Sequence, residues 1–391
     1  IHWQLADNLV HRGELVTDDG RYAARMPLYP LFLAPFAALG APGPGLARLA
    51  QALLGAASVW LVYRLARSAL GRRPAAVAGL LAAVDPYAVF FANLQLTEIP
   101  FTHAGLAFTA AAWQVWRRPH VAAWPAVLAV AALGPTLILL RPSAAGWTAL
   151  VYLILAWSAR QPARALARTA VFALLFTLAL LPWGLRNRAV LGGYAWLSAN
   201  GGVTLYDAQG PQARGDSDQT FLAELTATRP EFAAAGELER DQLLRRWAVD
   251  QMQRDPLRVL RLAAVKFART WNPWPNVAEH SGGLTGTVSA LYTLAVLIAA
   301  AVAVWRVWPP HGRPRRWLIL LAVPVLYFTL VHCVYVGSLR YRIPIMPFMV
   351  LTAATALRPQ QTPSPGAPPT TRCPTHGPGA PPRSAARGGG R

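Results

Sequence analysis

Nine apolar segments divide this chain of 391 residues, and they restrict its fold more than any other feature. A helix needs roughly 17–25 apolar residues to cross a bilayer, and these segments reach or approach that length. With 54% hydrophobic and 14% charged residues, the composition is that of an all-α polytopic membrane protein. The predicted spans are about Leu46–Ala66, Ala75–Ala92, Phe101–Trp116, Val121–Leu140, Ser143–Trp157, Ala167–Trp183, Thr285–Trp308, Trp317–Val336 and Ile343–Leu357.

Arginines collect in alternate loops between these segments. By the positive-inside rule the arginine-rich loops, none of which contains Asp or Glu, face the cytoplasm. Every acidic residue except Asp85, which falls within a span, then lies on the outer side. The loops in question contain Arg72 and Arg73, then Arg117 and Arg118, then Arg160, Arg164 and Arg168, and finally Arg313, Arg315 and Arg316.

The segments outside the spans differ in character. The proline-containing stretch Arg25–Phe36 is too short to span reliably, so we expect a re-entrant or interfacial segment. Glu237–Arg254 has the pattern of an amphipathic helix. The chain starts at Ile1 without a methionine, so we expect a fragment that lacks its N-terminus. The predicted parts are a first extracytoplasmic loop (1–45), six spans (46–183), a small extracytoplasmic soluble domain (184–284), three spans (285–357) and a disordered cytoplasmic tail (358–391).

The net charge of +20 does not indicate nucleic-acid binding. The basic residues are almost all arginine, and apolar spans separate the basic clusters, so no continuous basic groove is expected. The two cysteines, Cys333 and Cys373, are too few for a disulfide framework or a thiolate metal site.

A short polar hinge, Asn93–Pro100, carries Glu98 at the outer face between two spans. Taken singly, Glu98 is explained equally well as a solvated loop acid, an arginine as an interfacial anchor, and a histidine as a packing residue. Together, the charges at this face point to a phosphate held at the membrane, as in a phospholipid or polyprenyl-phosphate head group. We expect Glu98 at the mouth of an outer cavity, near Arg25 or the Arg340–Arg342 turn. The candidate residues at this face are Glu98, Arg25, Arg141, Arg340, Tyr341, Arg342, His103 and His332.

Six motifs occur in a fixed order along the chain. They are RMPLYPLFLAPF (Arg25–Phe36), NLQLTE (Asn93–Glu98), LLRPS (Leu139–Ser143), LPWGLRN (Leu181–Asn187), SANGGVTLY (Ser198–Tyr206) and RYRIPIMP (Arg340–Pro347). Over about Ile1–Leu357 the chain resembles membrane glycosyltransferases of the GT-C class. It is most similar to bacterial proteins like glycosyltransferase family 39, which are related to protein O-mannosyltransferases and lipid A aminoarabinose transferases.

The resemblance implies a GT-C-like fold in the bacterial cytoplasmic membrane. It also implies transfer of a sugar from a polyprenyl-phosphate donor to a glycan, lipid or protein acceptor on the outer face. Family members carry an acidic residue in the first outer loop, just before a segment like Trp3–Gly13, and here that acid would precede Ile1. Glu98 would then support catalysis, Arg25, Arg141, Arg340 and Arg342 would neutralise the lipid phosphate, and Tyr341 would donate a hydrogen bond. Some members use a divalent metal, but no cluster here has ligand spacing, so no cofactor is assigned.

Two other readings remain open from the sequence. A transporter or flippase of lipid-linked saccharides would place ionisable groups near the bilayer midplane and often shows repeated halves, neither of which is evident here. A non-catalytic scaffold, or an inactive truncated family member, is the other alternative. An apolar span followed by an acidic residue upstream of Ile1 would favour the enzyme.

Overall fold

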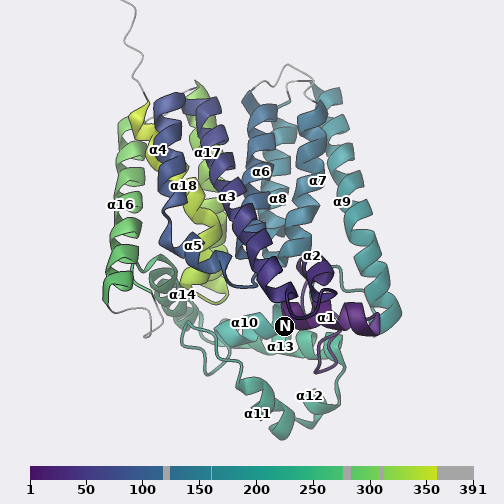
Figure 1. Ribbon diagram of the computed structural model, residues 1–391. Coiled ribbons are helices and arrows are strands. Elements are labelled where there is room, and N and C mark those ends of the chain that lie inside the picture. Colours follow the sequence, from purple (N-terminus) through teal and green to yellow (C-terminus); the bar gives the residue numbers. More distant parts are fainter. Residues whose placement is uncertain (118–123, 160, 276–282, 309–311, 359–391) are drawn as a thin grey trace, which may run out of the picture. The chain divides into compact units, whose positions relative to one another are not determined.

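The computed structural model describes residues 1–117, 124–159, 161–275, 283–308 and 312–358 (Figure 1). Within these ranges every regular element is helical, and residues 1–358 form one compact unit. The parts predicted as separate domains therefore pack together, and the division into domains remains a prediction. The predicted tail, apart from Arg358, lies outside the described residues.

Long helices run side by side and form the bundle (Figure 1). Most of the predicted apolar segments coincide with one helix each. Residues 75–92 cover two helices, residues 143–157 cover part of a 3-10 helix and an α-helix, and residues 343–357 cover an α-helix and parts of its two flanking 3-10 elements. The structure thus confirms an all-α membrane protein. The bundle helices are α3 (Gly43–Leu70), α4 (Arg72–Ala83), α5 (Pro86–Ala92), α6 (Glu98–Arg117), α7 (Trp124–Leu140), α8 (Ala145–Trp157), α9 (Pro162–Leu191), α16 (Gly283–Val307), α17 (Gly312–Val334) and α18 (Met346–Ala354), which the 3-10 turn η3 (Thr355–Leu357) follows.

Not every helix of the bundle is long enough to span a membrane unaided. By length and composition, α3, α9, α16 and residues 314–334 of α17 are long and apolar enough, and α4 with α5 would make a fifth, bent span. Among the described residues α7 and α8 are shorter apolar helices. The count of nine spans therefore remains a prediction.

The span expected over Ala75–Ala92 is not one straight helix. Its two parts, α4 and α5, meet at an angle of 52°. Asp85 occupies the break, and its carboxylate accepts hydrogen bonds from the backbone N–H groups of Tyr87 (2.9 Å) and Ala88 (3.3 Å). These groups start α5 and lack partners within the helix, so Asp85 caps it, while Pro86 sits at a first-turn position that needs no N–H.

Shorter helices gather at one end of the bundle (Figure 1). They are α1 (His2–Arg12), α2 (Leu28–Ala37), α10 (Gly201–Gln209), α11 (Phe221–Thr228), α12 (Pro230–Ala234), α13 (Glu237–Arg254) and α14 (Pro256–Trp271). The bounds of α13 match the amphipathic helix expected from the sequence. Side chains of Val203, Phe221, Phe232 and Leu244 form a small core of their own among these helices.

Helix α9 continues eight residues beyond the expected boundary at Trp183. Neither Pro182 nor Gly184 interrupts the helix, and Gly192 ends it in the left-handed conformation at φ 72°. A left-handed residue after the last turn favours glycine, because a Cβ would be strained there. The segment predicted as the start of a soluble domain is therefore the end of a bundle helix.

Aromatic packing holds the middle of the bundle together. Trp147 of α8 is almost fully buried and contacts the rings of four phenylalanines on α6, α17 and α18. Such pairs add about 0.5–1.5 kcal/mol each beyond the burial of their area. The four rings belong to Phe101, Phe108, Phe328 and Phe348. This cluster fixes α6 against the helices that flank the Arg340 turn.

The arginine-rich loops and the Glu98 region lie at opposite ends of the bundle. The arginine-rich starts of α4, α9 and α17 lie at the end far from α1, whereas the start of α6, the end of α7 and the start of α18 lie near the short helices (Figure 1). Arg118 and Arg160 are outside the described residues. The predicted alternation therefore places Glu98, Arg141 and Arg340 at the same end.

Cysteine labelling tests this orientation. In a background of Cys333→Ser and Cys373→Ser, Glu231→Cys on α12 should react with a membrane-impermeant maleimide added to intact cells, because its side chain is about half exposed at the end assigned outside. Arg72→Cys, which is also exposed but lies in an arginine-rich loop, should react only after the membrane is opened. The opposite labelling pattern would contradict the topology.

Candidate functional site

The polar hinge between α5 and α6 is held by two neighbouring helices. α5 ends at Ala92 and α6 begins at Glu98, which confirms the predicted break between two apolar segments. The fully buried side chain of Gln51 in α3 donates to the carbonyl oxygens of Ala92 (3.3 Å) and Leu94 (2.7 Å). Its own side-chain oxygen accepts from the hydroxyl of Tyr29 in α2. The hinge is therefore fixed by α2 and α3.

Glu98 is fully buried and is bound by two arginines from distant parts of the chain. Its Oε1 atom accepts from Nη2 of Arg141 at 2.7 Å and from Nε of Arg340. Its Oε2 atom is also buried and has no hydrogen-bond partner among the described residues. A buried charge is costly unless it is paired, so the two guanidinium groups stabilise a carboxylate at this position. The contact with Arg340 confirms the expected proximity, but Glu98 is enclosed rather than open at a cavity mouth.

Arg141 is fixed by three contacts in the turn between α7 and the 3-10 helix η1 (Pro142–Ala144). Besides its ion pair with Glu98, its Nε donates to Thr97 Oγ1 at 2.7 Å. Its guanidinium lies 5.2 Å from the centroid of the Phe101 ring, within the range of a cation–π interaction. The Arg141 side chain is only 13% exposed. It therefore serves mainly to hold Glu98 and the hinge.

Arg340 is more accessible than Arg141. It lies in the 3-10 helix η2 (Leu339–Ile345) between α17 and α18, and 36% of its side chain is exposed. Nε faces Glu98, and among the described residues no hydrogen bond or ion pair involves the two terminal nitrogens of Arg340. One carboxylate against two guanidiniums also leaves one positive charge that Glu98 does not neutralise. An arginine in this state is suited to bind a phosphate or carboxylate in a bidentate manner.

Three other predicted residues lie around Arg340. Arg25 is near enough to interact electrostatically with Arg340 and Tyr341. The ring of Tyr341 stacks on His332, with centroids 3.9 Å apart and planes 9° from parallel. His332 is buried, and its Nδ1 atom is 3.1 Å from the carbonyl oxygen of Val336. This contact orients His332, which in turn supports Tyr341.

A histidine that the sequence did not indicate also lies beside these arginines. The ring of His2 in α1 contacts the ring of Tyr29 edge-on, with centroids 5.0 Å apart. Burial, together with the positive charges of Arg25 and Arg340, lowers the pKa of His2 to about 3. The sequence carries no signal for it, because His2 stands in a polar stretch without a motif of its own.

Arg342 occupies a different place from Arg340, although only one residue separates them. It is fully buried, and its Nη1 and Nη2 atoms donate to the carbonyl oxygen of Asn272 (2.7 Å) and to Thr293 Oγ1 (3.4 Å). Its guanidinium lies 5.2 Å from the centroid of the Tyr87 ring. These contacts connect η2 with the end of α14, with α16 and with α5. They give Arg342 a structural explanation, and a role in substrate binding remains only a prediction.

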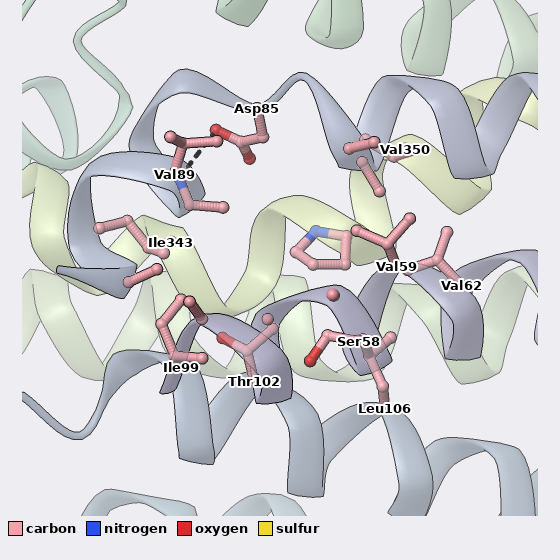
Figure 2. A pocket seen from close by; sticks show the side chains of 18 of the residues that line it. Ser58, Val59, Val62, Asp85, Val89, Ile99, Thr102, Leu106, Ile343 and Val350 are labelled. Carbon is pink, nitrogen blue, oxygen red and sulfur yellow. Dashed lines mark hydrogen bonds between the residues drawn. The ribbon is translucent and has the colours of Figure 1, made fainter. Parts of the chain in front are cut away.

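An apolar cavity of about 430 Å³ lies in the bundle beside the hinge (Figure 2). Side chains from α3, α4, α5, α6, η2 and α18 line it. Ile99 and Ile343, which are sequence neighbours of Glu98 and Arg342, are among them. Among the described residues no hydrogen bond or ion pair joins His103 to Glu98; the Nδ1 atom of His103 is 3.2 Å from the hydroxyl of Ser58, a residue of the cavity wall. The cavity offers an apolar surface close to the cationic turn.

No metal centre can be assigned in the part of the chain that the structure describes. No group of three or more His, Cys, Asp or Glu side chains is close enough together there to hold an ion. The divalent metal that the family resemblance raised therefore remains open.

Comparisons with known proteins bear on the fold. Residues 24–183 match the model of a family described as dolichyl-phosphate-mannose-protein mannosyltransferase. The structure is similar to archaeal oligosaccharyltransferase AglB from Archaeoglobus fulgidus, solved with an inhibitory peptide and a dolichol-phosphate, with a TM-score of 0.54 and 13% identity over 91% of this chain. This chain has the GT-C fold.

The GT-C chain covers 45% of the AglB chain. It also matches ArnT from Cupriavidus metallidurans bound to undecaprenyl phosphate, with a TM-score of 0.43 and 14% identity, over 91% of this chain and 72% of that one. No curated protein sequence matches it. The fold and the apolar helices identify an integral membrane protein.

A double-mutant cycle can measure the interaction between Glu98 and Arg141. Glu98→Gln should destabilise the purified protein by about 3–5 kcal/mol, because it leaves buried guanidinium charge uncompensated. The double variant Glu98→Gln/Arg141→Gln should be more stable than the sum of the two single variants predicts. Thermal unfolding in detergent, with the exposed Glu231→Gln as control, measures both effects. Additive effects would show that Glu98 and Arg141 do not interact.

Proposed function

We propose that this GT-C protein transfers a sugar from a polyprenyl-phosphate donor to an acceptor on the extracytoplasmic face of the bacterial cytoplasmic membrane. The observation that carries this proposal is the buried carboxylate of Glu98 between Arg141 and Arg340, with positive charge in excess. The family match over residues 24–183 supports the same reaction class.

The lipid phosphate of the donor fits the charge at this site. As the sugar leaves, negative charge grows on the phosphate, and preorganised cations lower the energy of that transition state. The Arg340 side chain is partly exposed, its terminal nitrogens have no partner among the described residues, and Arg25 is nearby. We assign the phosphate to these two arginines, with Tyr341 as a further hydrogen-bond donor.

The hydrocarbon part of the donor requires an apolar surface near the phosphate. The 430 Å³ cavity beside the hinge supplies one, because Ile99 and Ile343 in its wall flank the segments that carry Glu98 and Arg340. We assign the first part of the polyprenyl chain to this cavity.

Glu98 has one oxygen left for the substrate. Arg141 and Arg340 both bind Oε1, whereas Oε2 is buried without a partner among the described residues. A carboxylate oxygen in this state readily accepts a hydrogen bond from a hydroxyl group. We therefore assign Glu98 a supporting role, in which Oε2 orients a sugar or acceptor hydroxyl. The acceptor would approach from the short helices α10–α14, which lie at this end of the bundle (Figure 1).

A matched set of arginine variants tests the phosphate assignment. With a defined polyprenyl-phosphate sugar, Arg340→Ala should raise the donor KM by about 10-fold to 150-fold, because a charge-assisted hydrogen bond contributes about 1.5–3 kcal/mol. Arg315→Ala, at the opposite end of the bundle, should leave the KM unchanged. Equal effects of the two substitutions would mean that Arg340 is only an interfacial anchor.

A second prediction concerns Glu98 itself. In membranes, where protein amount can be matched to wild type by immunoblot, Glu98→Gln should lower the transfer rate by roughly a hundredfold or more, the usual scale for a positioned electrostatic group. Glu231→Gln, on the exposed surface of α12, is the matched control. A wild-type transfer rate in Glu98→Gln would show that Glu98 has only a structural role.

A further inference from the structure

Helix α14 has two faces of different character. Leu262, Lys266 and Thr270 are buried on its inner side. On the other side Leu257, Leu260 and Phe267 are 77%, 68% and 50% exposed. Their spacing of three and seven residues puts them on one face of the helix. A helix that only faced water would carry polar residues there, so this face is expected to have an apolar partner.

The inner face of α14 holds the segment that carries Arg340. The Lys266 ammonium group donates to the carbonyl oxygen of Val334, the last residue of α17, at 2.9 Å. Gly337 packs so tightly on the helix that a Cβ atom there would lie 2.6 Å from the Lys266 Cα atom. Asn272, which follows the last turn of α14, accepts from Arg342. The position of α14 is therefore coupled to the position of η2.

One contact gives the position of the end of α14 along the axis of α17. The indole N–H of Trp271 donates to Thr329 Oγ1 at 3.3 Å. Thr329 lies five residues before the end of α17, which corresponds to about 7 Å along the helix axis. The end of α14 thus lies beside the last turns of a helix long enough to span the membrane. Interfacial helices bury their apolar face to a similar depth, about 5–10 Å.

Two arginines lie close in sequence to the apolar face, Arg261 on α14 and Arg254 at the end of α13. Arg254 and Arg261 are exposed, and among the described residues neither forms an ion pair or a hydrogen bond through its side chain. By contrast, Arg258 points inward and donates to the carbonyl oxygens of Gln209 and Gly210. An apolar face next to unpaired cations is complementary to the surface of an anionic bilayer.

We propose that α14 is a membrane-surface helix. Its exposed apolar face inserts into the leaflet at this end of the bundle, and Arg254 and Arg261 contact anionic lipid head groups. Through Lys266 and Asn272, the leaflet then helps to hold the turn that bears Arg340. This inference does not depend on the transfer reaction, because it follows from the packing and exposure of α14 alone.

Fluorescence quenching tests the insertion. In the background without native cysteines, Leu260→Cys and Phe267→Cys are labelled with the environment-sensitive dye NBD, and so is Glu231→Cys on α12 as a matched exposed control. Each full-length protein is placed in vesicles of phosphatidylcholine and phosphatidylglycerol in a three-to-one ratio. Lipids with a nitroxide near the head group should quench the dye at 260 and 267, while aqueous iodide should quench it only at 231.

Two outcomes would overturn the insertion. Iodide quenching at 260 and 267 as strong as at 231 would show that the face is in water. Protection from both quenchers would show that another protein surface, such as a second copy of the chain, covers it.

A comparison of two lipid compositions tests the contribution of Arg254 and Arg261. In pure phosphatidylcholine the lipid quenching at 267 should be weaker than in the mixed vesicles. Arg254→Gln/Arg261→Gln should remove this difference and leave the quenching in pure phosphatidylcholine unchanged. If the difference between the two lipid compositions persists in the double variant, or is absent from the parent, the assignment of Arg254 and Arg261 to lipid head groups is wrong.

Discussion

A single oxygen atom, Oε1 of Glu98, joins three segments that lie far apart in the sequence. The start of α6, the end of α7 and the turn between α17 and α18 meet there through Arg141 and Arg340. A buried ion pair contributes little net stability, but the loss of one partner is expensive, because the remaining charge cannot reach water. The three segments therefore stay together, because separating Glu98 from its two arginines would leave a buried charge without a partner. The aromatic packing around Trp147 fixes the same helices at a deeper level.

The same interaction supports the proposal that this end of the protein binds an amphiphilic anion. Glu98 neutralises one of its two arginines, so one positive charge remains there. Burial and the positive charges of Arg25 and Arg340 together lower the pKa of the nearby His2. An apolar cavity lies next to the segments that carry these charges. A lipid phosphate would satisfy both features at once, since it needs cations at its head and hydrocarbon surface along its tail. A soluble phosphate compound would use only the cations and not the apolar cavity.

The sequence predicted the positions of helices better than the directions of side chains. Hydropathy and the alternation of arginines locate each apolar segment, the hinge before Glu98 and the bounds of α13, because these depend on composition alone. Arg340 and Arg342 looked equivalent, since both stand in one turn. In a 3-10 helix, however, residues two apart point about 120° away from each other. Arg340 consequently faces Glu98, and Arg342 points to Asn272.

Other features depend on packing that no local pattern reveals. The bend at Asp85 divides one apolar segment into two helices, although Asp85-Pro86 gave a local hint of a cap. Gln51 was detectable in principle as a polar residue inside an apolar span, but its two carbonyl partners belong to the end of α5 and to the hinge that follows it. The role of His332 as a support for Tyr341 follows from ring stacking across two elements.

The buried Lys266 has a practical consequence. It is the only lysine among 391 residues, and none of its surface is exposed. Amine-directed cross-linkers and acylating reagents thus have no accessible side chain to attack while α14 stays packed on α17. Acylation of Lys266 would require α14 to separate from the bundle. The rate of acylation therefore measures how often this local opening occurs.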